Sequence, residues 1–185
     1  FLSGANIGEI KHWRDGKCVR KLGDYITTTK HILSLIRLKN GRIASGTEKG
    51  SGDSSGTIFI WDLKKGKCLY AVPNAGCSVK ALAELPDGRI ASASDKTITL
   101  WRDRTCDATL IGHTERVLSL VVLLDGTLAS GAVDGTIKLW SAEGACVRTL
   151  SHHAAPCACR SSCFVKVLVV LDDGALVSAS SNGVV

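Results

Sequence analysis

Four tryptophans close the same short phrase at regular intervals along the chain. Trp13, Trp61, Trp101 and Trp140 follow one another at spacings of 39 to 48 residues. The fullest copy of the phrase begins at Leu128 and reads Leu-Ala-Ser-Gly-Ala-Val-Asp-Gly-Thr-Ile-Lys-Leu-Trp. A period of about 40 to 50 residues indicates repeated supersecondary units, each of which buries its apolar surface against a neighbouring copy. This repeat constrains the fold more than any other feature of the sequence.

Each period contains four short predicted strands. In the clearest copy these strands cover 117–123, 127–132, 136–141 and 146–150. The turns between them contain Asp125-Gly126 and Asp134-Gly135, which are typical of hairpins because glycine tolerates positive φ. Four antiparallel strands joined in this way form one twisted sheet. Packing such sheets face to face around an axis covers their apolar faces, so we predict an all-β chain.

The repeat resembles the WD40-repeat (G-beta-like) β-propeller family over essentially the whole chain. The resemblance rests on the four tryptophans, on the Asp-Gly turns and on the Ile-Lys-Leu-Trp run that ends at Trp140. A Trp-Asp pair occurs once, at Trp61-Asp62, and a Gly-His pair once, at Gly112-His113. The resemblance implies a WD40-like propeller built from four-stranded blades.

In this family a His, a strand Ser, a turn Asp and the Trp form a hydrogen-bonded network within one blade. The resemblance therefore implies a structural network at His113, Ser130, Asp134 and Trp140, with partial sets at Ser92, Asp95 and Trp101, at Ser45 and Trp61, and at Trp13. A His, an Asp and a Ser are also the serine-hydrolase combination. However, the repeat accounts for each of them, and no strained nucleophile turn surrounds Ser130. We therefore predict no catalytic residue and no enzymatic activity.

Counting strands predicts three complete blades and two partial ones. The complete blades are expected at 32–72, 78–110 and 117–150, and the partial blades at 1–22 and 164–185. The two partial blades overlap in type, so joining them would duplicate strands rather than close a four-bladed ring. We expect residues 1–185 to form a single propeller segment, an incomplete arc whose other blades lie elsewhere in a longer chain or in another chain.

The family resemblance implies a non-catalytic scaffold for protein–protein interaction within a larger assembly. The face that partners often contact would carry His31, Ser78, Arg116 and Phe164, with Thr47, Ser94, Ala132 and Ser180 nearby. The expected partners are other proteins, including further propeller blades from the same or another chain, and no cofactor is expected. Two alternatives stay open: the propeller part of a larger enzyme, such as a kinase or ubiquitin-ligase receptor, and a subunit that contacts RNA.

Positive charge is concentrated in the first part of the chain. The net charge is +6, and residues 1–70 hold 13 Lys and Arg against 6 Asp and Glu. Such a surface is either a solvated face or a contact for an acidic protein or an RNA backbone. No Arg-rich run or RNA-binding aromatic motif is present, so nucleic acid is not the expected partner. No apolar run approaches the length of about 18 residues that a membrane span needs.

Half of the eight cysteines follow the repeat. Cys18, Cys68, Cys106 and Cys146 each begin the fourth strand of a blade, one per blade, too far apart to form disulfides with one another. We interpret them as small buried hydrophobic residues. Free thiols in this number favour a reducing compartment, so we expect an intracellular, cytoplasmic protein.

A second group of cysteines lies in an irregular loop at 151–163. It contains His152, His153, Cys157, Cys159 and Cys163. Thiolates and imidazoles suit zinc, but the C-x-C-x3-C spacing is not that of a standard finger. A metal site, a redox or disulfide role and a plain loop all stay open, and no metal is included in the prediction.

Overall fold

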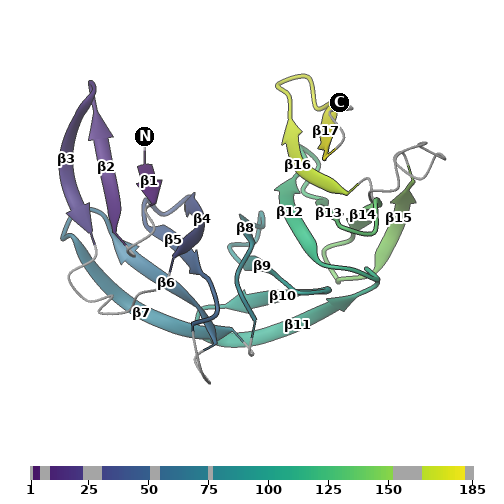
Figure 1. Cartoon of the computed structure of the whole chain (residues 1–185), viewed down its shortest axis with the longest axis horizontal. Coiled ribbons are helices and arrows are strands. Elements are labelled where there is room, and N and C mark those ends of the chain that lie inside the picture. Colours follow the sequence, from purple (N-terminus) through teal and green to yellow (C-terminus); the bar gives the residue numbers. More distant parts are fainter. Residues whose placement is uncertain are drawn as a thin grey trace. The chain divides into compact units, whose positions relative to one another are not determined.

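The computed structural model describes residues 2–4, 9–22, 31–50, 55–74, 77–151 and 164–181. Every helix or strand assigned in these ranges is a β-strand, which confirms the prediction of an all-β chain. The strands form five antiparallel sheets, three with four strands, one with three and one with two (Figure 1). In the described ranges no helix has the length and apolar character needed to span a membrane.

The chain divides into two compact units, residues 1–82 and 83–185. The first unit contains a three-stranded sheet of β1 (Leu2–Gly4), β2 (Ile10–Arg14) and β3 (Lys17–Leu22), and a four-stranded sheet of β4 (Ile32–Arg37), β5 (Ile43–Thr47), β6 (Gly56–Asp62) and β7 (Lys67–Asn74). A core cluster of Ile10, Leu22, Ile43 and Trp61 joins these two sheets. Each of the four residues is at most 1% exposed, so the apolar faces of the two sheets cover one another.

The strand β8 (Ala81–Glu84) spans the division between the two units. It is the first strand of a sheet that continues with β9 (Ile90–Ser94), β10 (Thr97–Arg102) and β11 (Thr105–Ile111). The second unit also contains the sheet of β12 (Val117–Val122), β13 (Leu128–Ala132), β14 (Ile137–Trp140) and β15 (Cys146–Leu150), and the pair β16 (Val165–Val170) and β17 (Leu176–Ser180). Ala129, Ile137, Val165 and Leu168 form the core between these last two sheets.

In the clearest copy the four strands begin and end within one residue of their predicted bounds, and the turns lie at the predicted glycines. Gly126 and Gly135 have φ values of 90° and 75°, in the region that favours glycine. Three four-stranded blades and two partial blades are therefore present in the described residues, as the repeat predicts. The interpretation of residues 1–185 as a single propeller segment stays a prediction.

At two positions a glycine of one sheet faces a valine that follows in another segment, with no room for a side chain between them. An ideal Cβ on Gly131 of β13 would lie 2.5 Å from Cγ1 of Val165 in β16. Gly46 of β5 faces Val79 in the same way. The missing side chain lets the two backbones come close, which explains the glycine in the repeated phrase.

Candidate functional site

Four side chains form a hydrogen-bonded network inside the sheet β12–β15. The hydroxyl of Ser130 in β13 accepts the indole N–H of Trp140 at 2.8 Å and lies 2.7 Å from Nε2 of His113. On the other side of the imidazole ring, Nδ1 lies 2.8 Å from a carboxylate oxygen of Asp134. The structure therefore brings together the four residues that the family resemblance implies for one blade.

Asp134 connects two segments that are distant in the sequence. It lies in the turn between β13 and β14, and its carboxylate accepts the backbone N–H of Thr114 at 3.0 Å. It also accepts the backbone N–H and the hydroxyl of Thr136, at 2.9 and 2.6 Å. One carboxylate thus fixes both the turn before β14 and the segment that leads into β12.

Burial and hydrogen bonding set the charge states of this pair. Burial lowers the pKa of His113 below its ordinary value, although the hydrogen bond with Asp134 acts in the opposite direction. Burial raises the pKa of Asp134, but hydrogen bonds from Thr136, His113 and backbone amides outweigh it and hold the pKa at about 2. Near neutral pH the pair is a neutral imidazole and a carboxylate. Nδ1 then donates to Asp134, and Nε2 accepts the hydroxyl proton of Ser130.

The network is built to stabilise the sheet rather than to react with a substrate. Ser130 is 0% exposed, and the side chain of His113 is also 0% exposed. Ser130 lies within a regular strand, and its hydroxyl already bridges Trp140 and His113. A nucleophilic serine instead needs an exposed position on a strained turn. The geometry therefore offers no route for a substrate to the hydroxyl.

The Trp–Ser hydrogen bond recurs in the other sheets. Trp61 donates to Ser45 at 2.9 Å, Trp101 to Ser92 at 2.8 Å and Trp13 to Ser3 at 2.8 Å. The sequence analysis missed Ser3, although Leu2-Ser3-Gly4 matches the Ala129-Ser130-Gly131 stretch of the fullest phrase and could have identified it. The bond ties the second strand to the third in the three four-stranded sheets and β1 to β2 in the three-stranded sheet.

Asp95 lies apart from the Trp101–Ser92 pair. It occupies the tight turn between β9 and β10 with a φ of 51°. Its backbone carbonyl accepts the N–H of Val117 at 2.8 Å and so joins this turn to β12. The assignment of Asp95 to the family network stays a proposal.

Four of the predicted partner-binding residues precede the first strand of a sheet. His31 and Arg116 are exposed, whereas Ser78 and Phe164 are half-buried. His31 lies 3.4 Å from Glu48, and Ser78 accepts the backbone N–H of Lys49 at 2.9 Å. His31 and Arg116 therefore present the side chains that a partner could reach most easily.

The other four predicted contact residues are buried. Thr47 and Ala132 are 0% exposed, Ser94 is 7% exposed and Ser180 is 9% exposed. Each of them ends the second strand of a sheet, where other strands or side chains cover it. The side chain of Thr47, for example, is bonded to the backbone of Thr57 across the strand pair. We therefore withdraw these four side chains from the expected contact surface.

The prediction that the repeated cysteines are buried is wrong. Cys18, Cys106 and Cys146 are exposed, and only Cys68 is half-buried. The strands β3, β11 and β15, which hold these three cysteines, are mostly exposed, so the cysteines are not covered by another sheet. The thiols donate to the carbonyl two residues onward, as from Cys18 to Arg20 at 3.6 Å. Burial raises the pKa of the Cys68 thiol.

The second cysteine group lies outside the described residues. It comprises His152, His153, Cys157, Cys159 and Cys163, and its role stays open. Within the described ranges, no group of three or more His, Cys, Asp and Glu side chains is arranged to hold a metal ion.

Sequence reasoning also missed a buried arginine that joins three segments. Arg89 is 8% exposed and donates to Asp87 at 2.6 Å, to Asp107 at 3.0 Å and to the carbonyl of Ala142 at 2.6 Å. Burial opposes its charge, but the hydrogen bonds to Asp87 and Asp107 raise its pKa. These contacts connect β11 with the turn between β14 and β15 and involve residues far apart in the sequence. No local pattern could have indicated them.

A protein-family model described as "WD domain, G-beta repeat" matches residues 66–102 and 104–141. The first matched stretch covers β7 to β10 and the second covers β11 to β14. Each stretch therefore begins with the last strand of one sheet and continues with the first three strands of the next. The sequence repeat therefore begins one strand earlier than the four-stranded sheet.

Several curated proteins are similar to parts of this chain. "Nuclear distribution protein PAC1-2" of Uncinocarpus reesii is 29% identical over 62% of this chain and 31% of its own length. "Cell division cycle 20.6, cofactor of APC complex" of Arabidopsis thaliana is 35% identical over 55% of this chain and 25% of its own length. "Target of rapamycin complex subunit wat1" of Schizosaccharomyces pombe is 29% identical over 54% of this chain and 34% of its own length. The chain thus spans about a third or less of these relatives. The two matched repeats and the repeated four-stranded blades support the assignment of the chain to the WD40-repeat family.

Proposed function

We propose that this chain is a non-catalytic protein–protein interaction module, a WD40-like propeller subunit of a larger assembly. The observation that carries the proposal is the burial of the polar network. The His113–Asp134–Ser130 set is enclosed in the sheet, with Ser130 0% exposed. The side chains of His113, Asp134 and Ser130 therefore stabilise the packing of the strands.

Exposed positions at the starts of the sheets are the candidates for partner contact. His31 precedes β4 and Arg116 precedes β12, and both are exposed. Rigid sheets hold these short segments in place, and a binding residue on a rigid scaffold loses little freedom when a partner binds. Ser78 and Phe164 occupy the equivalent places before β8 and β16 and complete the proposed set.

The names of two relatives support participation in an assembly. One is called a cofactor of the APC complex and the other a subunit of the target of rapamycin complex. The first of these names also favours a second candidate, in which the module serves a larger enzyme as a cofactor or recruiting part. The five described cysteines are free thiols, which supports the intracellular location that we propose.

Photo-crosslinking within the native assembly tests the proposal. A photoreactive amino acid replaces His31 or Arg116 in the full-length protein, and mass spectrometry identifies the crosslinked neighbour. A matched control places the same group at Arg148, an exposed residue of the outer strand β15. We expect protein neighbours at positions 31 and 116 and few at 148. Protein crosslinks confined to position 148, or crosslinks to RNA alone, would overturn the proposed contact surface.

A further inference from the structure

A small cleft in the first unit is lined by cationic side chains. It lies between the hairpin β2–β3 and the turn that joins β6 to β7, and its volume is about 310 Å³. We call it the basic cleft, and it is lined by His12, Arg14, Val19, Arg20, Leu63 and Lys64. One of its arginines is fixed in place, because Nη1 of Arg20 donates to the carbonyl of Lys64 at 2.7 Å. The position of this guanidinium is thus set by the fold.

The second unit contains a similar arginine contact with a different charge balance. Arg89 also donates to a carbonyl in the turn between the third and fourth strands of the next sheet, that of Ala142. There, Asp87 and Asp107 neutralise the guanidinium. Within the described residues, by contrast, no carboxylate lies within ion-pair distance of the cations at 14, 20 and 64.

Two acidic residues lie at the hairpin: Asp15 in its turn, next to Arg14, and Glu9 just before β2, which is already engaged in ion pairs. Glu9 pairs with Lys11 and with Lys21, each at 3.2 Å. These two pairs lower the pKa of Glu9, which therefore stays ionised near neutral pH and bound to its two lysines. Within the described residues, Arg14, Arg20 and Lys64 of the basic cleft form no ion pair, although Asp15 and Asp62 lie beside Arg14 and Lys64 in the sequence. Cations that are not held in ion pairs attract an anionic group to such a cleft.

An apolar surface accompanies the charge. The pairing of β2 with β3 shifts between His12 and Trp13, so that Val19 is the bulged residue between Cys18 and Arg20. The bulge turns Val19 outward, and it is 52% exposed. Leu63 lines the same cleft and is half-buried. The basic cleft therefore offers an apolar contact among its cations.

We infer that the basic cleft binds an acidic, extended segment of a partner protein, with carboxylates on Arg14, Arg20 and Lys64 and an apolar side chain against Val19. This inference rests on the proposed interaction function and names one class of partner. The lining residues include no Phe, Tyr or Trp on which a nucleotide base could stack. Alternating carboxylates and apolar side chains fit the cleft better than a chain of bases and phosphates.

Fluorescence anisotropy with the full chain tests the inference. The probe is a short fluorescent peptide of Glu and Asp around one central Leu, and its counterpart carries Gln and Asn in place of the acids. In the variant Arg14→Gln/Lys64→Gln the hydrogen bond from Arg20 is kept, so the fold is expected to be retained. The removal of two exposed cations should weaken peptide binding about fivefold. The Gln and Asn peptide should not bind measurably.

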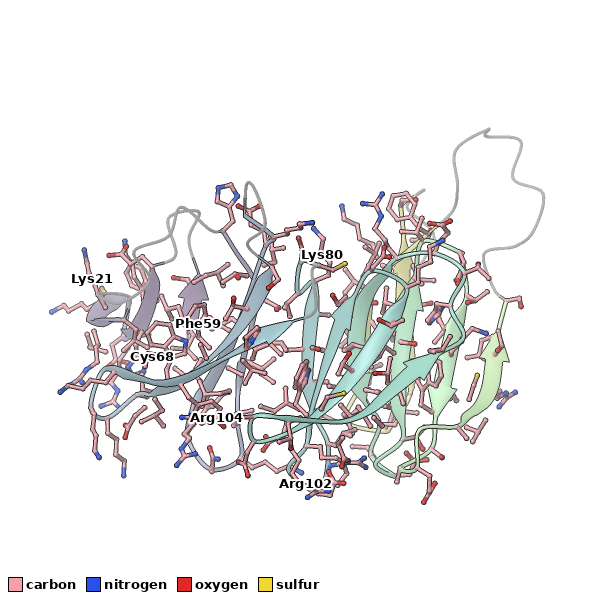
Figure 2. All side chains as sticks on the ribbon, turned by 90° about the horizontal axis from the view of Figure 1, so that it is seen from below. Lys21, Phe59, Cys68, Lys80, Arg102 and Arg104 are labelled. Atoms are coloured by element: carbon pink, nitrogen blue, oxygen red, sulfur yellow. The ribbon has the colours of Figure 1, made fainter. Side chains whose placement is uncertain are left out.

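The control variant is Lys49→Gln/Lys80→Gln. It removes the same charge from exposed positions of the same unit, and Lys80 lies well away from the hairpin residue Lys21 (Figure 2). We expect this variant to bind as the unchanged chain does. Equal weakening in both double variants would show general electrostatic attraction and would overturn the inference. Tighter binding of a uridine oligonucleotide than of the acidic peptide would overturn it in favour of RNA.

A second comparison tests the apolar contact. Val19→Ser should weaken binding of the Leu-containing peptide, and replacing that Leu by Ser should add no further loss, because both changes remove one contact. If the two changes instead reduced the binding free energy independently and additively, the proposed contact between Val19 and the peptide Leu would be contradicted. If the cleft variants bind the peptide normally while position 31 or 116 still crosslinks to protein, only this inference fails. If no protein neighbour is found at any position, the proposed function fails instead.

Discussion

The substitution Ser130→Ala tests how the polar network stabilises its sheet. The hydroxyl of Ser130 lies 2.8 Å from the indole nitrogen of Trp140 and 2.7 Å from Nε2 of His113. Removing this hydroxyl leaves the indole N–H of Trp140 and Nε2 of His113 without their partner, and these residues are only 1% and 6% exposed. Each buried polar group that loses its hydrogen-bond partner costs about 1–3 kcal/mol, so we expect the free energy of unfolding to fall by about 2–5 kcal/mol.

Ser45→Ala is the matched control in the sheet β4–β7. Ser45 and Trp61 are both 0% exposed and share one hydrogen bond of 2.9 Å, but among the described residues no histidine is bound to this hydroxyl. The substitution leaves only one buried donor, the indole N–H of Trp61, without its partner. The free energy of unfolding should therefore fall by about 1–3 kcal/mol. The structure thus predicts a larger loss at Ser130 than at Ser45.

Urea denaturation followed by tryptophan fluorescence measures both losses. Because the two serines lie in different units, amide hydrogen exchange in β13 and in β5 serves as the local readout. Protection in β13 should fall more in Ser130→Ala than protection in β5 falls in Ser45→Ala. Equal losses would refute the reasoning, because His113 would then contribute nothing through this hydroxyl.

Three further predictions concern the sheet β12–β15. Gly131→Ala should cost about 1–3 kcal/mol in thermal denaturation, because the added Cβ meets Val165 at 2.5 Å. Trp140→Ala should cost about 3–5 kcal/mol, because its side chain is almost completely buried. Urea titrations should show stability falling as the pH drops below about 6.5, because the unfolded chain protonates His113 more readily than the folded chain does. Below about pH 4, protonation of Asp134 should remove about a further 2 kcal/mol.

Each of these predictions has a control. Ala93 occupies the place of Gly131 in the sheet β8–β11, so a Cβ is tolerated there and Ala93→Gly should cost only about 0.5–1 kcal/mol. The pH dependence near 6 should disappear in His113→Gln and persist in His31→Gln, since His31 is exposed. An unchanged melting temperature in Gly131→Ala or Trp140→Ala would contradict the packing described for this sheet. The same pH dependence in both histidine variants would contradict the role of His113.

The sequence predicted the strands and turns because these depend on local patterns. The fourth strand of the clearest copy was expected at 146–150, and β15 spans those residues. The second strand was expected at 127–132 and is one residue shorter in the structure. Turn glycines such as Gly126 are needed for their backbone conformation, so the sequence alone identifies them.

Burial and long-range contacts could not be predicted in the same way. The repeat places Cys146 at the start of an outer strand, but it does not say that the adjacent face lacks a covering sheet. The family resemblance placed Ala132 and Thr47 near the face that partners contact, whereas both residues are buried in the structure. Arg89 contacts a carbonyl 53 residues onward, and only the packing of two sheets brings these groups together.

His113, Ser130 and Asp134 are enclosed in one blade and serve its stability. Nitrogen-15 NMR of the His113 imidazole tests this most directly, because the hydrogen bonds assign one protonation state. Near neutral pH the account predicts a neutral ring that carries its proton on Nδ1, hydrogen-bonded to Asp134, with slow exchange of that proton. A charged imidazolium at neutral pH, or a proton on Nε2 that exchanges rapidly with water, would contradict it.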